Sequence, residues 1–184
     1  DEDRVVLNIG GIANITYLPR DPLQAVIGFD TGPGNTLLDA WTERHLHQAY
    51  DAEGTWAAQG HVDQSLLTAL LQDPFFQLQP PKSTGCDYFN LDWVLAQISD
   101  PSALSPVDLQ ATLLELTARR MSLAIQACMP EQGSVFLCGG GAYNTQLKTR
   151  LASLLPAFTI TTPAALRIEP QWLEAMALAR LARH

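Results

Sequence analysis

One aspartate lies in a glycine-rich segment where its carboxylate could act on a ligand. Asp30 is part of the sequence GFDTGPGN, which spans residues 28–35. The apolar run at residues 23–27 predicts a strand, and residues 36–41 predict the start of an amphipathic helix. We therefore expect Asp30 at the carboxyl end of a strand, where open α/β sheets bind their ligands.

The residues beside Asp30 predict room for such a ligand. Gly32 and Gly34 carry no Cβ, so a ligand can approach the backbone closely, and Pro33 restricts the turn. Unpaired N–H groups at the start of the next helix would attract a phosphate or an oxyanion. A carboxylate beside such a site is suited to act as a general base. Aspartates also commonly cap turns, so both interpretations of Asp30 stay open at this point.

Two further glycine turns follow predicted strands. Gly10 and Gly11 separate strands predicted at 5–9 and 12–18, which is typical of a hairpin and also places backbone amides where they could face a phosphate. Residues 139–141 are all glycine and follow a fully apolar strand predicted at 134–138. Three glycines between a strand and a helix leave bare backbone on which a flat ligand could lie.

Two other charged residues are candidates with simpler alternative explanations. Lys82 lies in an irregular loop, residues 74–90, where it could meet an anion or simply be solvated. Glu174 lies near the start of a helix predicted over 170–183, where the helix dipole alone favours an acidic side chain.

The elements that must position these residues follow a regular order. Three strands come first, followed by a helix and a long helical stretch. Two strand–helix units complete the chain: the strand at 134–138 with the helix after it, and the strand at 158–161 with the helix at 170–183. Within the long stretch, Ser105 and Pro106 are typical of the first residues of a helix, which we expect to run to Cys128. The order predicts an α/β fold with a mixed five-stranded sheet and helices on both faces. The three glycine turns would then line one edge of that sheet.

Composition excludes several classes of partner and site. The 184 residues suffice for one domain with a real core, and the net charge of −8 argues against nucleic acid or an anionic membrane as partner. No apolar run is long enough to span a membrane, and no signal peptide is expected from the opening residues. The three cysteines and four histidines are too scattered for a disulfide framework or a metal site, and a reducing cytoplasm is the expected location.

Several motifs, taken together, carry a family resemblance. They run in order along the chain: LNIGGIAN at 7–14, GFDTGPGN at 28–35, PKSTG at 81–85, FN at 89–90, QATL at 110–113, CGGG at 138–141 with Asn144, and Glu174 with Ala175. On these residues the chain resembles the anhydro-N-acetylmuramic acid kinase family of the actin, Hsp70 and sugar-kinase superfamily. The resemblance implies that residues 1–184 form the ribonuclease H-like second lobe of a two-lobe kinase, with a helical insertion at about 48–130.

The resemblance also implies a reaction in bacterial cell-wall recycling. Water attacks the anomeric carbon of 1,6-anhydro-N-acetylmuramic acid, and the freed O6 takes the γ-phosphoryl group of ATP with Mg²⁺, giving N-acetylmuramate 6-phosphate. By position, Asp30 is the expected base, and Glu174 is an acidic residue near the sugar with a catalytic or orienting role. A homodimer is expected from the family alone.

The remaining site residues are also assigned through the resemblance. The sugar is expected to contact Asn14, Asp30, Thr31 and Glu174. The nucleotide is expected to contact Gly10, Gly11, Thr112, Gly139, Gly140, Gly141 and Asn144. No residue is assigned to a metal, and Asn8 stands where many relatives in the superfamily have an acidic residue.

The sequence departs from the family pattern in its extent. The phosphate loop of the first lobe and the extreme C-terminal segment are both missing, and the chain starts at Asp1 and ends within a predicted helix. We therefore expect a piece of a longer protein that has little or no kinase activity by itself. Two alternatives stay open: a non-catalytic lobe that binds nucleotide or forms dimers, and a kinase for a different amino sugar.

Overall fold

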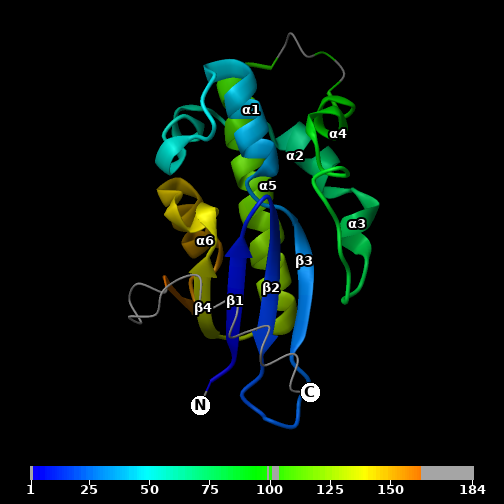
Figure 1. The fold of residues 1–184 in the computed structure, drawn as a ribbon, viewed down its shortest axis with the longest axis vertical. Helices are drawn as coiled ribbons and strands as arrows, with labels where there is room; N and C mark the ends of the chain where they lie inside the picture. The colour runs from blue at the N-terminus through cyan, green and yellow to red at the C-terminus, as the bar shows by residue number, and fades with distance from the viewer. Residues whose placement is uncertain (1, 99, 101–103, 163–184) are drawn as a thin grey trace.

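A five-stranded sheet forms the centre of the computed structural model, which describes residues 2–98, 100 and 104–162. Its strands are β1 (Arg4–Ile9), β2 (Ile12–Leu18), β3 (Ile27–Pro33), β4 (Gly133–Cys138) and β5 (Phe158–Thr161). The order is β3-β2-β1-β4-β5; β1 is antiparallel to β2 and parallel to β4 (Figure 1). The predicted α/β class and mixed sheet are confirmed.

The rest of the described chain consists of helices and the loops that join them. They are α1 (Thr36–Leu46), α2 (Gln64–Leu71), α3 (Pro74–Gln77), α4 (Leu91–Leu95), α5 (Pro106–Cys128) and α6 (Thr145–Leu154), with short 3₁₀ turns η1 (Ala52–Gly54), η2 (Ala57–Gln59) and η3 (Gly140–Tyr143). The start of α5 is confirmed: Ser105 caps it through a bond from the Asp108 amide, and Pro106 is its first residue. Asp63 and Asn144 cap α2 and α6 in the same way.

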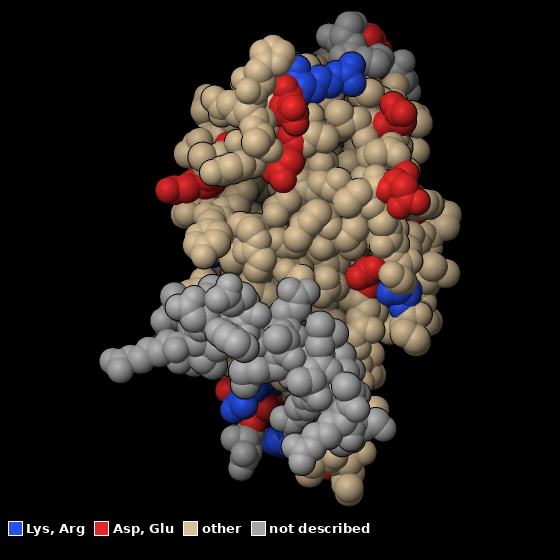
Figure 2. Space-filling model, in the orientation of Figure 1, with Lys and Arg blue, Asp and Glu red and all other residues tan. Residues whose placement is uncertain are grey.

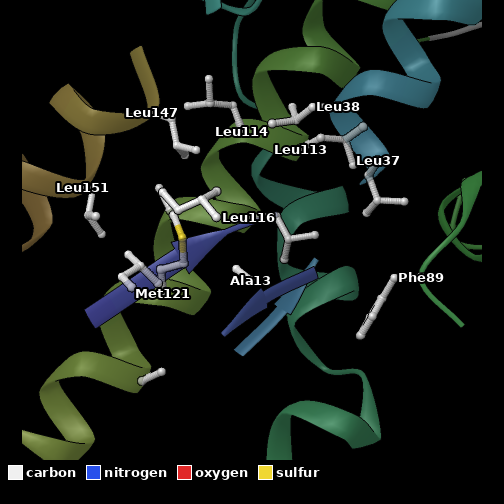
Figure 3. Packing of buried hydrophobic residues seen from close by; sticks show 14 of the residues in the cluster. Ala13, Leu37, Leu38, Phe89, Leu113, Leu114, Leu116, Met121, Leu147 and Leu151 are labelled. Atoms are coloured by element: carbon white, nitrogen blue, oxygen red, sulfur yellow. The ribbon is translucent and has the colours of Figure 1, made fainter. Parts of the chain in front are cut away.

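The core lies between one face of the sheet and α5. Alternate residues of the strands point to this face, so Phe29, Ile15, Leu7 and Leu137 lie side by side across four strands and are buried. Against them pack Leu113, Leu116 and Met121 of α5, all fully buried, as Figure 3 shows. The sheet therefore leaves its other face, at the ends of these strands, for polar residues.

A buried carboxylate joins α5 to α6. Glu115 of α5 accepts hydrogen bonds from Arg119 Nε at 2.6 Å and from Arg150 Nη2 of α6 at 2.7 Å. Burial raises the pKa of Glu115, but the hydrogen bonds and charges of the two arginines outweigh it and hold the pKa below its usual value. The ion pair thus fixes α6, and with it the turn that precedes α6, against the long helix.

Two sequence predictions need correction here. The third strand starts at Ile27 rather than Leu23, which is 93% exposed, and it continues through the glycine-rich segment to Pro33. Asp30 therefore lies within a strand and not at its end. Within the stretch 48–130, the described residues form short helices, loops and the long helix α5, which packs directly on β2 and β3. Its assignment as an insertion stays a prediction. The helix predicted over 170–183 lies outside the described residues.

Acidic side chains are spread over much of the face shown in Figure 2, with basic ones at few places, in keeping with the net charge of −8. Across the described residues, no helix combines the length and apolar character needed to cross a membrane.

Candidate active site

A row of polar residues crosses three strands on the face opposite the core. Asn8 of β1 pairs with Asn14 of β2, and Asn14 pairs with Asp30 of β3. Paired residues share a face of the sheet, so the three side chains lie side by side. The ladder shifts register between Ala13 and Asn14, an irregularity of the kind often found beside active sites.

The loop at residues 81–85 holds the Asp30 carboxylate from the side. Ser83 Oγ and the Thr84 amide both donate to Oδ2 of Asp30, at 2.9 and 2.8 Å. The Asp30 amide in turn donates to the carbonyl of Lys82 at 3.0 Å. Among the described residues Asp30 forms no ion pair, and both side-chain hydrogen bonds end on Oδ2. The carboxylate is therefore oriented by neutral donors, with Oδ1 left for a ligand or water.

The same loop borders a cavity of about 430 Å³ beside Asp30 that is widely open to solvent. Asn14, Asp30 and Ser83 all line it. Two predicted sugar-binding residues, Asn14 and Asp30, are thus brought together in one cavity of a size suited to a small ligand. Thr31 is not: it points to the core, is fully buried, and donates to the Ala13 carbonyl at 3.1 Å. The Thr31 side chain faces away from this cavity because neighbouring residues of a strand face opposite ways, and its contact with the sugar stays a prediction.

An aromatic cluster anchors the loop. Phe89 is fully buried between Phe75, Phe76 and Trp93, with ring centroids at 5.5, 5.5 and 4.9 Å. Lys82 packs over the Phe75 ring at 4.7 Å and donates to the Phe75 carbonyl at 3.1 Å. Its pKa is lowered, first by burial and then by the charge of Arg120. Lys82 therefore fastens the loop to α3 and is neither fully solvated nor aimed at an anion.

The glycine turns meet at one edge of the sheet, as predicted. The amides of Gly34 and Thr36 donate to the Gly11 carbonyl at 2.9 and 3.1 Å, and the Asn35 amide donates to the Gly10 carbonyl at 2.8 Å. Asn35 Nδ2 also donates to the Ile9 carbonyl at 3.1 Å. Gly34 and Asn35 precede α1, and of the first amides of α1 itself, that of Thr36 is bonded within the protein in this way.

Most of these glycines are required by close internal packing. A Cβ on Gly34 would lie 2.3 Å from the Gly10 carbonyl oxygen, and one on Gly32, whose φ is +133°, would lie 2.7 Å from the Phe76 ring. A Cβ on Gly139 would meet the Asn8 Oδ1 at 2.4 Å. Gly140 differs, since the nearest atom to its Cβ position is 3.8 Å away. Only at Gly140, of these four, does the missing side chain leave open space for a ligand.

A second cavity, of about 590 Å³, opens beside Gly140. It lies between α1, the segment 50–53, and the turn from Gly140 to Thr145. The predicted nucleotide residues Gly140, Gly141 and Asn144 line it. Asp39 also lines this cavity and was missed by sequence reasoning, because its helical context predicts only an exposed polar position.

Two predicted site residues stand apart from these cavities. Thr112 is fully buried; it donates to the Asp108 carbonyl at 2.7 Å and accepts from the Asp63 amide at 2.9 Å. Its hydroxyl both donates and accepts in bonds that join α5 to the start of α2, and its contact with the nucleotide stays a prediction. Glu174 lies outside the described residues.

Ser83 and Thr84 were quoted in the PKSTG motif but given no role. The sequence contains a signal for a functional loop, namely two hydroxyl residues and a glycine in a stretch of irregular composition. The sequence does not show that the loop binds Asp30, because Asp30 lies 53 residues before Ser83 in the chain.

Comparison with known sequences gives consistent matches. A sequence model of the family described as anhydro-N-acetylmuramic acid kinase matches residues 1–184. The anhydro-N-acetylmuramic acid kinase of Coxiella burnetii (strain RSA 493 / Nine Mile phase I) is 51% identical over 182 residues, covering 99% of this chain and 49% of the relative. That of Shewanella sp. (strain MR-4) is also 51% identical over 182 residues, covering 98% and 49%.

Solved structures share the fold at low sequence identity. An activator of the 2-hydroxyisocaproyl-CoA dehydratase from Clostridium difficile, with bound ADPNP, superposes with a TM-score of 0.56 at 19% identity, over 95% of this chain and 57% of that one. The xylulose kinase from Rhodospirillum rubrum gives 0.51 at 16%, over 86% and 34%.

Proposed function

The chain belongs to the anhydro-N-acetylmuramic acid kinase family, and we propose that the protein containing it opens 1,6-anhydro-N-acetylmuramic acid with water and phosphorylates the freed O6 from ATP. The product would be N-acetylmuramate 6-phosphate, an intermediate of cell-wall recycling. The chain spans about half the length of the curated relatives it matches, so the activity is proposed for the intact protein.

One observation carries the proposal: a carboxylate held on a rigid strand beside a cavity, with one oxygen turned to neutral donors and no ion pair within the described residues. Asp30 would take a proton from water as the water oxygen bonds to the anomeric carbon. The bond from that carbon to O6 breaks, and its electron pair stays on O6. O6 then bonds to the γ-phosphorus of ATP, and ADP leaves. The strand limits Asp30 to the orientation that aims the water.

ATP and its metal are expected to bind through different groups. The cavity at Gly140 and Gly141 supports nucleotide binding beside a glycine turn. The described residues contain no group of three His, Cys, Asp or Glu side chains that could hold a metal by themselves. Mg²⁺ commonly binds through phosphates with one or two carboxylates and water, so we expect it to arrive with ATP and to neutralise charge on the transferred phosphoryl group. The homodimer implied by the family stays a prediction.

The test compares wild type with Asp30→Asn in the intact protein. With ATP, Mg²⁺ and the anhydro-sugar, the substitution should lower kcat by about 10²- to 10⁴-fold, because it removes the base at constant shape. Asp92→Asn, at an exposed position in the first turn of α4, is the matched control and should keep full activity.

Ordinary N-acetylmuramate is offered in parallel, because it needs no ring opening. Equal turnover of the anhydro-sugar by wild type and Asp30→Asn would remove Asp30 from the mechanism. Turnover of ordinary N-acetylmuramate alone would indicate a kinase for a different amino sugar.

A further inference from the structure

We propose that an open cavity between η2, α5 and α6 binds a small carboxylic acid with an apolar body, and that the ligand carboxylate pairs with the Arg119 guanidinium. This cavity shares no lining residue with the cavities beside Asp30 and Gly140. The proposal goes beyond the proposed function and does not depend on it. It gives a second role to Glu115 and its arginines, which join α5 to α6.

The cavity has the size and the mixed lining of a small-molecule site. Its volume of about 380 Å³ lies within the range of such sites. Helix α6 packs along α5, and η2 packs on α5 as well, so three segments enclose it. Ala57 and Leu114 give the lining a buried apolar part, and Arg119 and Arg150 give it a charged part. A ligand with an apolar body and one charged group matches this lining.

The charges in the lining favour a ligand with a single negative charge. Burial raises the pKa of Glu115, but its two arginines hold the pKa below its usual value, so Glu115 is ionised at neutral pH. Glu115 balances one of the two guanidinium charges, and no other described residue in the lining is charged. One positive charge is left for a ligand. A carboxylic acid carries one negative charge at neutral pH, whereas a phosphate monoester carries about two.

Arg119 has the donors that such a carboxylate needs. Its Nε donates to Glu115 at 2.6 Å, and its two terminal nitrogens have no hydrogen-bond partner among the described residues. Arg150 differs, because its Nη2 donates to Glu115 at 2.7 Å and its Nη1 to Ser153 Oγ at 3.0 Å. The terminal nitrogens of an arginine can bind both oxygens of one carboxylate side by side. Since Glu115 already holds the Arg119 guanidinium in place, a ligand would not have to order it.

Equilibrium dialysis of the intact protein against three small ligands tests the site. Benzoate has an apolar ring and a carboxylate, benzyl alcohol has the ring without the charge, and phenyl phosphate has the ring with a larger negative charge. We expect wild type to bind benzoate about tenfold more tightly than benzyl alcohol, because hydrogen bonds to a charged group add to the affinity. The part of the binding that depends on Arg119 should be tighter for benzoate than for phenyl phosphate.

Two variants locate the binding. Arg119→Met keeps an unbranched side chain and leaves Arg150 on Glu115; it should lower benzoate affinity about tenfold and leave benzyl alcohol affinity unchanged. Ala58→Trp fills the cavity from an exposed position in η2 without removing a charge, and it should cause loss of both ligands. Arg44→Met, at an exposed position in the last turn of α1 and outside the lining, is the matched control and should bind as wild type does.

The comparison of benzoate with benzyl alcohol on wild type needs no variant, so a variant that misfolds would not remove the test. Equal affinity of wild type for these two ligands, or unchanged benzoate affinity in Arg119→Met, would overturn the site. Tighter Arg119-dependent binding of phenyl phosphate would overturn the assignment of a carboxylic acid. None of these results changes the turnover of the anhydro-sugar, so failure of this proposal is distinguishable from failure of the proposed function.

Discussion

At the residue scale, the central feature is that the two carboxylate oxygens of Asp30 have different surroundings. Oδ2 receives Ser83 Oγ and the Thr84 amide, and this pair of bonds sets the plane of the carboxylate. Ser83 would then be a positioning residue, because it acts through Asp30. The loop at 81–85 is as much part of the site as the strand that carries the carboxylate.

Ser83→Ala in the intact protein should lower kcat about tenfold and leave KM nearly unchanged, because the loss of one hydrogen bond to a charged group misaligns the base. Steady-state kinetics with the anhydro-sugar measure both values. Ser83→Thr restores the hydroxyl and should recover most of the activity, while Ser65→Ala in α2 serves as control. A change in KM alone would contradict positioning and indicate a role in binding.

Asp39 makes a separate prediction about stability. Its folded pKa of about 6 exceeds the usual 3.8, so the folded state holds a proton between these pH values that the unfolded chain has lost. The free energy of unfolding therefore falls as pH rises through this window. Asp39→Asn should stabilise the protein by about 1–2 kcal/mol at pH 8 and little at pH 3.5, after allowance for solvent screening. Urea denaturation at both values checks this, with Glu43→Gln as reference; a loss of stability at pH 8 would mean that Asp39 has a partner.

At the scale of elements, short segments around the sheet are held by a few buried anchors. Asp73 caps α3 through the Phe75 amide, and it also accepts from Tyr88 and from Trp93 Nε1 at 2.8 Å. Together with Phe89 these contacts fix the irregular residues between α3 and α4. The loop that orients Asp30 is therefore ordered by packing well away from the carboxylate.

Phe89→Ala should destabilise the protein by about 3–5 kcal/mol, since it removes a fully buried ring and leaves a cavity. Denaturant unfolding measures the loss. At temperatures where the variant stays folded, kcat should also fall, because the 81–85 loop loses its anchor. Tyr88→Phe keeps the ring and removes one hydroxyl at the surface of the cluster, so it should cost about 1 kcal/mol or less. Equal losses from both variants would contradict the anchoring role of Phe89.

The spacing of apolar residues along the chain and the residues that cap helices predicted most of these elements. The start of α5 at Ser105 and Pro106 and the apolar strand β4 follow from local preferences that the tertiary structure leaves in place. The third strand was misplaced because glycine and proline predict turns, whereas here Gly32 is a strand residue that makes room for the Phe76 ring. The contact of Ser83 with Asp30 and the internal role of Thr112 depend on distant pairings that local sequence does not contain.

At the scale of the whole molecule, the sheet edge lies between two cavities. Asp30 and Asn14 line the one over β2 and β3, and Gly140 lines the one beside α1. The glycine turns between them are bonded to each other, and Asn8 continues the polar row toward β4. This arrangement suits a reaction in which a sugar and a nucleotide approach each other along one edge.

The 184-residue chain by itself should show little or no ATP-dependent phosphorylation of the anhydro-sugar, because it spans about half the length of its relatives and we expect the rest to complete the site. A coupled assay for ADP release compares this chain with the intact protein at equal concentration. Circular dichroism confirms that the shorter chain is folded. Activity close to that of the intact protein would show that this lobe is sufficient.

The bonds from the Gly34, Asn35 and Thr36 amides to the Gly10 and Gly11 carbonyls have a mechanical consequence. They clamp the tip of the first hairpin to the base of α1, so the two cannot tilt independently. A displacement of the hairpin tip would therefore also move the start of α1 and Asp39, one turn further on. Asp39 lines the cavity beside Gly140. A movement at one of the two cavities would then reach the other through main-chain hydrogen bonds, which side-chain substitutions leave in place.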